Sequence, residues 1–329
     1  MSACGNGTFV FGCELQGKGV TAQEDTIIGT TIWILASAAV LLGIYNMYLI
    51  KKIPIFHNSF GWFWASRTVG EIGSNAVHVI YSGPVTFLQL NSIPPVTGIV
   101  IFTIGYFFAC YACVMHQVVS LNRMLAVCAP LRYTTMFKKS TCIILTAYCA
   151  IIVLVAMSLY LIIPCNMVGY SPQLYEYVFV KCSPDIDRDY SLVGTVVNRF
   201  CFVVCFSTVI SDLVTLSRII WMKRKGQLGK SNVAMRRNVR FFFQTSIQNF
   251  TMMIALTMIV VVNNQPSPNG IYMNVLGFIT IIITHINNAL ALILFNPEVR
   301  ARFQIHVAPH MLSSFFSASN IFAGQATVT

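Results

Sequence analysis

The side chains of this sequence that could do chemistry lie inside long apolar runs. Arg67 and Glu71 are four residues apart, His78 follows them, and Arg199 and Asp212 lie in a later run. Acid and base catalysis needs a second carboxylate or a histidine held close to the first. Glu71 and Asp212 lie in different runs, and no metal-ligand spacing is present. The sequence therefore predicts neither an enzyme nor a cofactor.

Two of these side chains form a natural pair. Arg67 and Glu71 would share one face of a helix, so an internal ion pair that lowers the cost of membrane insertion is favoured over a signalling contact. His78 is expected to be a hydrogen-bonded core residue.

The ionisable residues of the later run have several possible partners. Asp212 is expected to pair with a loop base such as Arg218. Arg199 could meet an anionic group of a ligand, or it could pair with Asp189 or another loop acid, and the sequence leaves both interpretations open.

The composition excludes a water-soluble globular protein. Of 329 residues, 56% are hydrophobic and only 9% are charged, whereas a soluble domain carries about 25% charged residues. So few charges cannot cover the surface of a soluble fold. The same figures exclude a disordered chain, a coiled coil and a collagen. Lipid is the expected solvent.

The apolar runs predict an all-α membrane protein built as a seven-helix bundle. Helices and closed barrels alone satisfy backbone groups in hydrocarbon, and these runs are too long for barrel strands. The expected spans are residues 26–50, 61–88, 97–127, 141–163, 192–222, 241–263 and 273–295. Residues 1–25 would form an outer segment, 26–295 the seven-span domain and 296–329 a short amphipathic helix with a tail.

The loop charges predict the orientation. Basic residues follow the first, third, fifth and seventh spans, at Lys51, Lys52, Arg132, Lys138, Lys139, Lys223, Arg224, Lys225, Lys230, Arg236, Arg237, Arg240, Arg300 and Arg302. The positive-inside rule makes that face cytoplasmic and the N-terminus extracellular. The net charge of +11 is therefore a topology signal with contacts to anionic lipid, and nucleic acid is not expected as a partner.

Three features belong to the expected outer face. Residues 1–25 lack the apolar core of a cleavable signal peptide, so the first span is expected to direct insertion. Asn6 begins a glycosylation triplet. Among eleven cysteines, those outside the spans are Cys4, Cys13, Cys165 and Cys182. We expect a Cys165–Cys182 disulfide across the loop after the fourth span, whereas Cys4 and Cys13 either pair or stay free.

The stretch at the inner end of the third span resembles the signature of rhodopsin-like G-protein-coupled receptors, Asp-Arg-Tyr-x-Ala-(Ile/Val)-x-x-Pro-Leu-x-Tyr. Six positions match in register: Arg123, Ala126, Val127, Pro130, Leu131 and Tyr133. The resemblance implies that Arg123 switches from an intracellular helix contact to the C-terminus of a G protein. Asn122 and Met124 replace the acid and the tyrosine, which predicts a weaker inactive-state lock and raised basal activity.

The same resemblance implies a polar network across three helices. Asn288 lies where the seventh span of the family has Asn-Pro-x-x-Tyr, although the proline and tyrosine are missing. Asn46 and Asn75 occupy the polar positions of the first and second spans. These amides, with His285, could hydrogen-bond to one another. Because Asn75 replaces the usual aspartate, a bound sodium ion is not expected.

Shorter motifs resemble one branch, the nematode chemoreceptors called serpentine receptor class x. They occur in the expected order over roughly residues 26–303, at Asn58–Gly61, Pro164–Cys165, Lys181–Ser183, Asp212–Thr215 and Arg240–Gln244. The Trp-x-Pro motif of the sixth span in the wider family is missing.

The resemblance also bears on the ligand. In amine receptors an aspartate lies eighteen residues outward from the switch arginine, but Gly105 occupies that place, so a biogenic amine is disfavoured. Aromatic and amide side chains would suit a small apolar or weakly polar ligand. With Arg199, the candidates are Tyr106, Phe107, Asn274 and Phe278.

The function implied by this resemblance is chemosensory. The expected protein lies in the plasma membrane, with the sensory cilium as one candidate location, and couples a small molecule to a heterotrimeric G protein. A seven-helix protein that no longer couples remains an alternative, because three family positions are lost. A transporter is a second alternative, although the sequence lacks the internal repeats that are typical of transporters.

Overall fold

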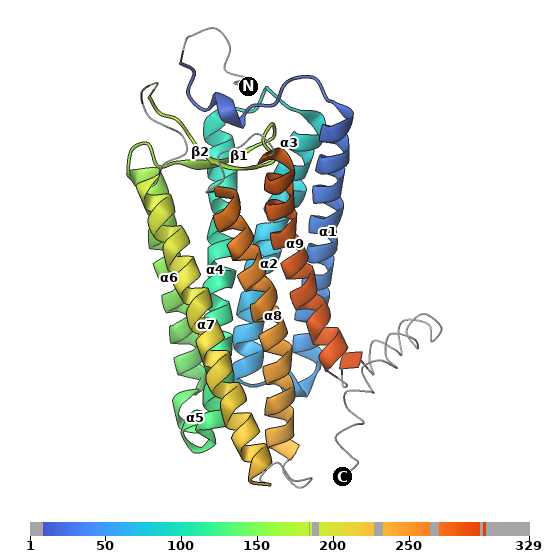
Figure 1. The fold of residues 1–329 in the computed structure, drawn as a ribbon, viewed down its shortest axis with the longest axis vertical. Coiled ribbons are helices and arrows are strands. Elements are labelled where there is room, and N and C mark those ends of the chain that lie inside the picture. The colour runs from blue at the N-terminus through green and yellow to red at the C-terminus, as the bar shows by residue number, and fades with distance from the viewer. Residues whose placement is uncertain are drawn as a thin grey trace, which may run out of the picture.

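The computed structural model describes residues 9–183, 185, 191–226, 233–263, 270–296 and 299–300. Long helices run roughly parallel through it as one bundle (Figure 1). The long helices are α1 (Gln23–Lys52), α2 (Ser59–Val77), α4 (Pro95–Cys128), α6 (Lys139–Ile162), α7 (Leu192–Arg224), α8 (Val233–Asn263) and α9 (Gly270–Phe295). The short elements are η1 (Cys13–Leu15), η2 (Pro54–Phe56), η3 (His78–Ser82), α3 (Gly83–Leu88), α5 (Pro130–Met136), β1 (Val168–Ser171) and β2 (Glu176–Phe179).

Every expected span is helical. Within the described residues α1, α4, α6, α7 and α9 are long and apolar enough to cross a membrane. The outward face of α6 is apolar, since Ile144, Tyr148, Ile151 and Leu154 are all more than half exposed. A face of this kind suits lipid better than water.

The second span contains a wide turn that the sequence did not predict. Helix α2 passes through the π turn η3 into α3, and Gly83 N donates to His78 O. Pro84 follows directly, and its ring lacks an N–H and would clash with the carbonyl four residues earlier in a regular helix. The wide turn relieves this conflict and leaves His78 and Ser82 buried.

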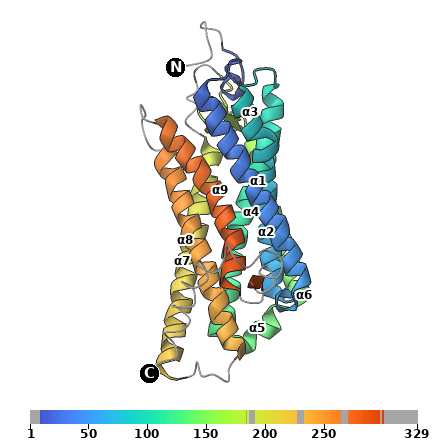
Figure 2. The ribbon, with the colours of Figure 1, turned by 90° about the vertical axis from the view of Figure 1, so that its right-hand side faces the viewer.

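Helix α4 is the central element, packing against α2, α6, α7 and α8. Gly70 allows its close contact with α2, because a Cβ there would lie 2.9 Å from Phe108 O. Helices α8 and α9 run side by side along the bundle (Figure 2). Helix α8 begins at Val233, eight residues before the expected start, so Arg237 and Arg240 lie on an exposed helical turn and not in a loop.

A two-stranded sheet corrects the expectation of an all-helical chain. Strands β1 and β2 pair antiparallel, from Val168 with Phe179 to Ser171 with Glu176, and lie across one end of the bundle (Figure 1). The predicted disulfide between Cys165 and Cys182 is present, with 5.2 Å between the Cα atoms.

The N-terminal segment from residue 9 packs over this hairpin. Gly17 N donates to Leu90 O at 2.8 Å, and Leu15 packs against Gly169, where a Cβ would lie 2.6 Å from Leu15 Cδ2. Asn6, Cys4 and residues 301–329, which hold most of the expected amphipathic helix, lie outside the described residues.

Candidate functional site

A cavity lies in the half of the bundle beneath the hairpin and has about 830 Å³ of empty space, the open solvent at its mouth included. Helices α2, α4, α7, α8 and α9 line it, with η3 and β2. Its lining residues are Ser74, His78, Phe102, Gly105, Tyr106, Ala109, Cys110, Cys113, Tyr177, Asn198, Cys201, Met252, Ala255, Leu256, Ile259, Phe278, Ile281 and His285. The cavity is thus mostly apolar, with a few polar groups, as ligand sites usually are.

The five expected ligand residues divide between this cavity and its surroundings. Tyr106 and Phe278 line it, and the Tyr106 hydroxyl donates to Asn198 Oδ1 at 3.2 Å. Asn274 lines a smaller gap beside it, which shares Phe278. Phe107 packs on other aromatic rings, and Arg199 is exposed on α7, so neither lines the cavity.

Gly105 also lines the cavity, where an amine receptor would carry its acid. A Cβ at this position would lie 2.9 Å from Val77 Cβ, so the glycine permits close packing of α4 against α2. An acidic side chain would have to separate the two helices.

Below the cavity, Glu71 is the centre of a buried polar network. Its Oε1 atom lies 3.2 Å from Arg67 Nε and 3.6 Å from His116 Nε2, and it accepts a hydrogen bond from Asn288 Nδ2 at 2.7 Å. The predicted Arg67–Glu71 ion pair is therefore present. Arg67 Nη1 also donates to Gln248 Oε1 at 3.1 Å.

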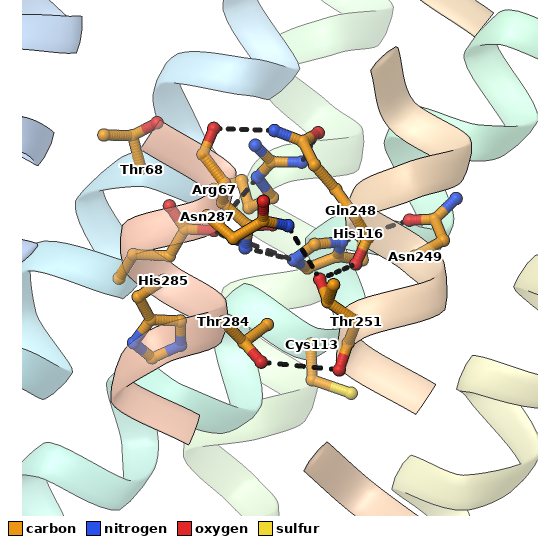
Figure 3. A network of polar contacts seen from close by, with 12 residues as sticks. Arg67, Thr68, Cys113, His116, Gln248, Asn249, Thr251, Thr284, His285 and Asn287 are labelled. Atoms are coloured by element: carbon orange, nitrogen blue, oxygen red, sulfur yellow. Dashed lines mark hydrogen bonds and ion pairs between the residues drawn. The ribbon is translucent and has the colours of Figure 1, made fainter. Parts of the chain in front are cut away.

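Side chains from α2, α4, α8 and α9 converge in this network (Figure 3). The second hydrogen of Asn288 Nδ2 points to His116 Nε2 at 3.2 Å, while His116 Nδ1 donates to Asn249 Oδ1. Asn249 Nδ2 donates in turn to Asp212 Oδ2 at 2.8 Å. Four helices, and α7 through Asp212, are thereby joined by one connected set of hydrogen bonds, in which Asn288 donates both to Glu71 and to His116.

Asp212 corrects one expectation. It accepts hydrogen bonds from Ser120 at 2.9 Å and from Asn249, and not from Arg218, whose guanidinium lies over Trp221 at 4.2 Å. Residues 212 and 218 are six positions apart, which places them on different faces of a helix.

The expected amides take part in the network in different ways. Asn75 Nδ2 lies 2.7 Å from His285 Nδ1, and Asn46 Nδ2 donates to Ala289 O at 3.2 Å. Asn288 reaches Glu71 directly. The sequence did not indicate His116, Gln248 and Asn249, although polar residues in apolar spans are a signal that could have found them.

Arg123 lies at the opposite end of the bundle from the hairpin and is only 3% exposed. Its Nη2 atom donates to Asn122 Oδ1 at 2.5 Å and to the Tyr133 hydroxyl at 3.1 Å. Its Nη1 atom donates to Asn238 Oδ1 on α8 at 3.4 Å. The guanidinium also lies 4.0 Å from the centre of the Phe60 ring.

The residues after Arg123 form the short helix α5. Pro130 begins it, which suits a residue without an N–H, and one turn brings Tyr133 back to within 2.6 Å of Ser59 Oγ. Leu131 is 89% exposed.

A row of stacked side chains on α2 connects the network to Arg123. The Arg67 guanidinium lies 4.5 Å from the Trp64 ring, and Trp64 packs edge-on against Phe60 at 5.0 Å between centroids. Phe60 then contacts Arg123. Contacts therefore run without a gap from His285 in the cavity, through Asn75 and Glu71, to this row.

Comparisons with known proteins agree with this geometry. A family model described as serpentine type 7TM GPCR chemoreceptor Srx matches residues 34–296. Squid rhodopsin is similar in structure, with a TM-score of 0.71 and 12% sequence identity, over 90% of this chain and 88% of that one. Among curated proteins none matches.

Proposed function

Because the chain belongs to the Srx family of serpentine seven-transmembrane chemoreceptors, we propose that it binds a small molecule in the cavity beneath the hairpin and signals through Arg123. A heterotrimeric G protein is the proposed partner. The binding candidates that remain are Tyr106, Phe278 and, at the neighbouring gap, Asn274.

The observation that carries this proposal is the continuous set of contacts between the two ends of the bundle. His285 lines the cavity and contacts Asn75, whose Nδ2 atom also donates to the backbone oxygen of Glu71. A ligand that moves His285 would therefore act on the Arg67–Glu71 pair. Coupling of this kind requires differential contacts in two states, which packed polar networks can provide.

We assign the parts of the chain accordingly. Residues 1–25 form an extracellular segment with a glycan acceptor at Asn6, residues 26–295 the receptor domain, and residues 296–329 an amphipathic helix and cytoplasmic tail. The charge distribution supports a plasma-membrane protein of this orientation, because Lys51, Lys52, Lys223 and Arg224 end helices at the face that holds Arg123.

The test of the proposal is agonist-dependent nucleotide exchange by the purified receptor in lipid nanodiscs, with G protein and a panel of small neutral odorants. We expect Arg123→Ala to lower the agonist-dependent rate about tenfold, because the variant loses charged hydrogen bonds to the partner that each contribute about 1.5 kcal/mol or more. Agonist binding should persist, because Arg123 lies far from the cavity.

Arg199→Ala is the matched control. It removes the same charge from the exposed surface of α7, so exchange should stay at the wild-type rate. Binding without exchange for any G-protein class, in the wild-type receptor itself, would instead support the alternative of a seven-helix protein that no longer couples.

Asn122 determines how firmly Arg123 is held in the absence of ligand. Its amide oxygen accepts from Arg123, and its Nδ2 atom donates to Ser59 Oγ at 3.3 Å. An aspartate would turn the first contact into a charge-assisted pair, which is about twice as strong. We therefore expect Asn122→Asp to lower basal exchange several-fold and Asn122→Ala to raise it. Equal basal rates in all three proteins would contradict this role.

A further inference from the structure

The inner wall of the cavity carries three polar residues, of which His78 and His285 each use Nδ1 in a hydrogen bond, to Ser82 and to Asn75. Ser74, His78 and His285 line it and are 2%, 7% and 3% exposed. Within the described residues no hydrogen bond is found for Ser74 Oγ or His285 Nε2, so both groups are available to pair with a molecule that enters the cavity. Both residues line a cavity that a ligand could enter.

The hydrogen bonds of Asn75 determine where the His285 proton lies. Asn75 Nδ2 has two hydrogens and lies 2.7 Å from Glu71 O and 2.7 Å from His285 Nδ1. A backbone carbonyl only accepts, so this contact fixes the orientation of the amide. An amide nitrogen only donates, so His285 Nδ1 is the acceptor. The ring is therefore neutral, and Nε2 carries its proton.

A neutral donor in an apolar cavity selects the chemistry of its ligand. Among the described residues the cavity lining holds no Lys, Arg, Asp or Glu, and Glu176 lines only the neighbouring gap. Neither an ammonium nor a carboxylate would therefore find a counter-ion in the lining of the large cavity. Such charges are costly to bury unpaired. An uncharged oxygen acceptor would satisfy the Nε2–H group, while Phe102, Met252 and Phe278 would contact an apolar body.

We propose that His285 Nε2 donates a hydrogen bond to the ligand, and that the receptor therefore recognises small neutral molecules with a carbonyl oxygen on an alkyl body, such as ketones, aldehydes and esters. This inference rests on the proposed ligand site and names the class of molecule bound there. The Ser74 hydroxyl lies in the same wall and supplies a second hydrogen-bonding group. Asn75 is the positioning residue, since its hydrogen bond to Nδ1 keeps the His285 proton on Nε2.

Binding can be measured without a G protein, by ligand-induced thermal shift and equilibrium titration of the full-length receptor in nanodiscs. The probes are 2-alkanones of five to nine carbons, the alkenes in which a methylene replaces each carbonyl oxygen, and 2-aminoheptane. We expect the best ketone to bind about tenfold more tightly than its alkene, because a buried donor left unpaired is penalised. The amine should bind no better than the alkene.

Variants at two positions separate hydrogen bonding from packing. His285→Leu should abolish the preference for ketone over alkene, and His285→Gln, which keeps an N–H donor, should retain part of it. Asn75→Leu removes the donor to His285 Nδ1, so the ring proton can lie on either nitrogen. Ketone affinity should then fall several-fold. Affinity for the matching 2-alkanol should be preserved, because its hydroxyl can donate to Nε2 as well as accept from it. Ile281→Leu, one turn away in the same wall, is the control and should keep the wild-type preference.

Two results would overturn the inference: equal affinity of the folded receptor for each ketone and its alkene, or no ketone binding at all. These outcomes differ from failure of the proposed function. Ketone binding without nucleotide exchange would refute coupling and leave this inference intact. Nucleotide exchange triggered only by a charged ligand would refute this inference and leave the proposed coupling intact.

Discussion

Replacing Glu71 by leucine should destabilise the folded receptor by about 3–5 kcal/mol, the usual cost of leaving one partner of a buried ion pair alone. Arg67 and Glu71 are 1% and 5% exposed, so water cannot take the place of the lost carboxylate. The Arg67 Nη2 atom already has no hydrogen-bond partner. Asn288 and His116 would lose their contact with the carboxylate in the same step.

The measurement is thermal unfolding of purified protein, read as the shift in midpoint temperature. The double variant Arg67→Met, Glu71→Leu should recover most of the lost stability, because removing both charges leaves no uncompensated ion. Glu24→Gln is the control at an exposed acid of α1, with an expected change below about 0.5 kcal/mol. A double variant as unstable as the single one would show that the ion pair is not the cause.

The double variant also distinguishes the two roles considered for the pair. If Arg67 only lowers the cost of placing Glu71 in the bundle, the folded double variant should show wild-type nucleotide exchange. If the guanidinium carries the contact from Glu71 to Trp64, ligand binding should persist while exchange falls. The proposed function predicts the second result.

Much of the fold could be predicted because a membrane imposes simple rules. A run of about 20 apolar residues must be a helix in lipid, and each expected span is one. The disulfide could be predicted because few cysteines lie outside the spans, and the structure confirms it. The hairpin was missed: Val168 to Phe179 is too short and too mixed in composition for a periodic signal, and its pairing depends on the disulfide and on the N-terminal segment packed over it.

The polar network could be predicted only in part. Offsets along single spans placed Asn75, Asn288 and His285, but not Glu71 as their common partner. That role depends on which faces of α2, α4 and α9 meet. The sequence of one span does not determine this, because it depends on how the helices pack against one another. Asp212 illustrates the same limit, since its nearest base in sequence lies on another face of its helix, whereas Asn249 of α8 lies 2.8 Å away.

The N-terminal segment of residues 9–22 and the hairpin of residues 168–179 together form an outer cap. We expect the stability of this cap to depend more on Asp25 than on any other residue. It is fully buried at the start of α1. Its Oδ1 atom accepts hydrogen bonds from Gln89 at 2.8 Å, from the Tyr175 hydroxyl at 2.6 Å and from Lys18 at 3.2 Å, and its Oδ2 atom accepts from Ala22 N. One carboxylate thus joins the N-terminal segment, the end of the second span and the hairpin.

Burial and the neighbouring carboxylate raise the pKa of Tyr175 above its ordinary value, so its hydroxyl keeps its proton and continues to donate at neutral and moderately alkaline pH. In Asp25→Ala, the buried donors of Gln89 and Tyr175 would both lose their acceptor. Hydrogen bonds to a charged group contribute about 1.5–3 kcal/mol each, so we expect the cap to open at least about a hundredfold more often.

Hydrogen exchange of backbone amides in residues 9–22 and 168–179 measures this opening. Protection of these amides should fall in Asp25→Ala, while that of the inner half of α4 stays unchanged. Lys18→Met is the matched control. The Lys18 side chain is 43% exposed, and a surface ion pair contributes less than about 1 kcal/mol, so its effect on protection should be small.

Opening of the cap should also change how fast a bound ligand leaves. Tyr177 of β2 lines the ligand cavity, and β2 is held in place by its pairing with β1, by the disulfide and by Asp25 through Tyr175. A cap that opens more often should let a bound ketone leave faster, raising its dissociation rate with little change in the ketone-over-alkene preference set by His285. Faster exchange of the cap amides with an unchanged ligand dissociation rate would mean that the ligand leaves by another path. The gap lined by Asn274 and Phe278 between α8 and α9 is the candidate path, and a mutation that fills this gap would test it.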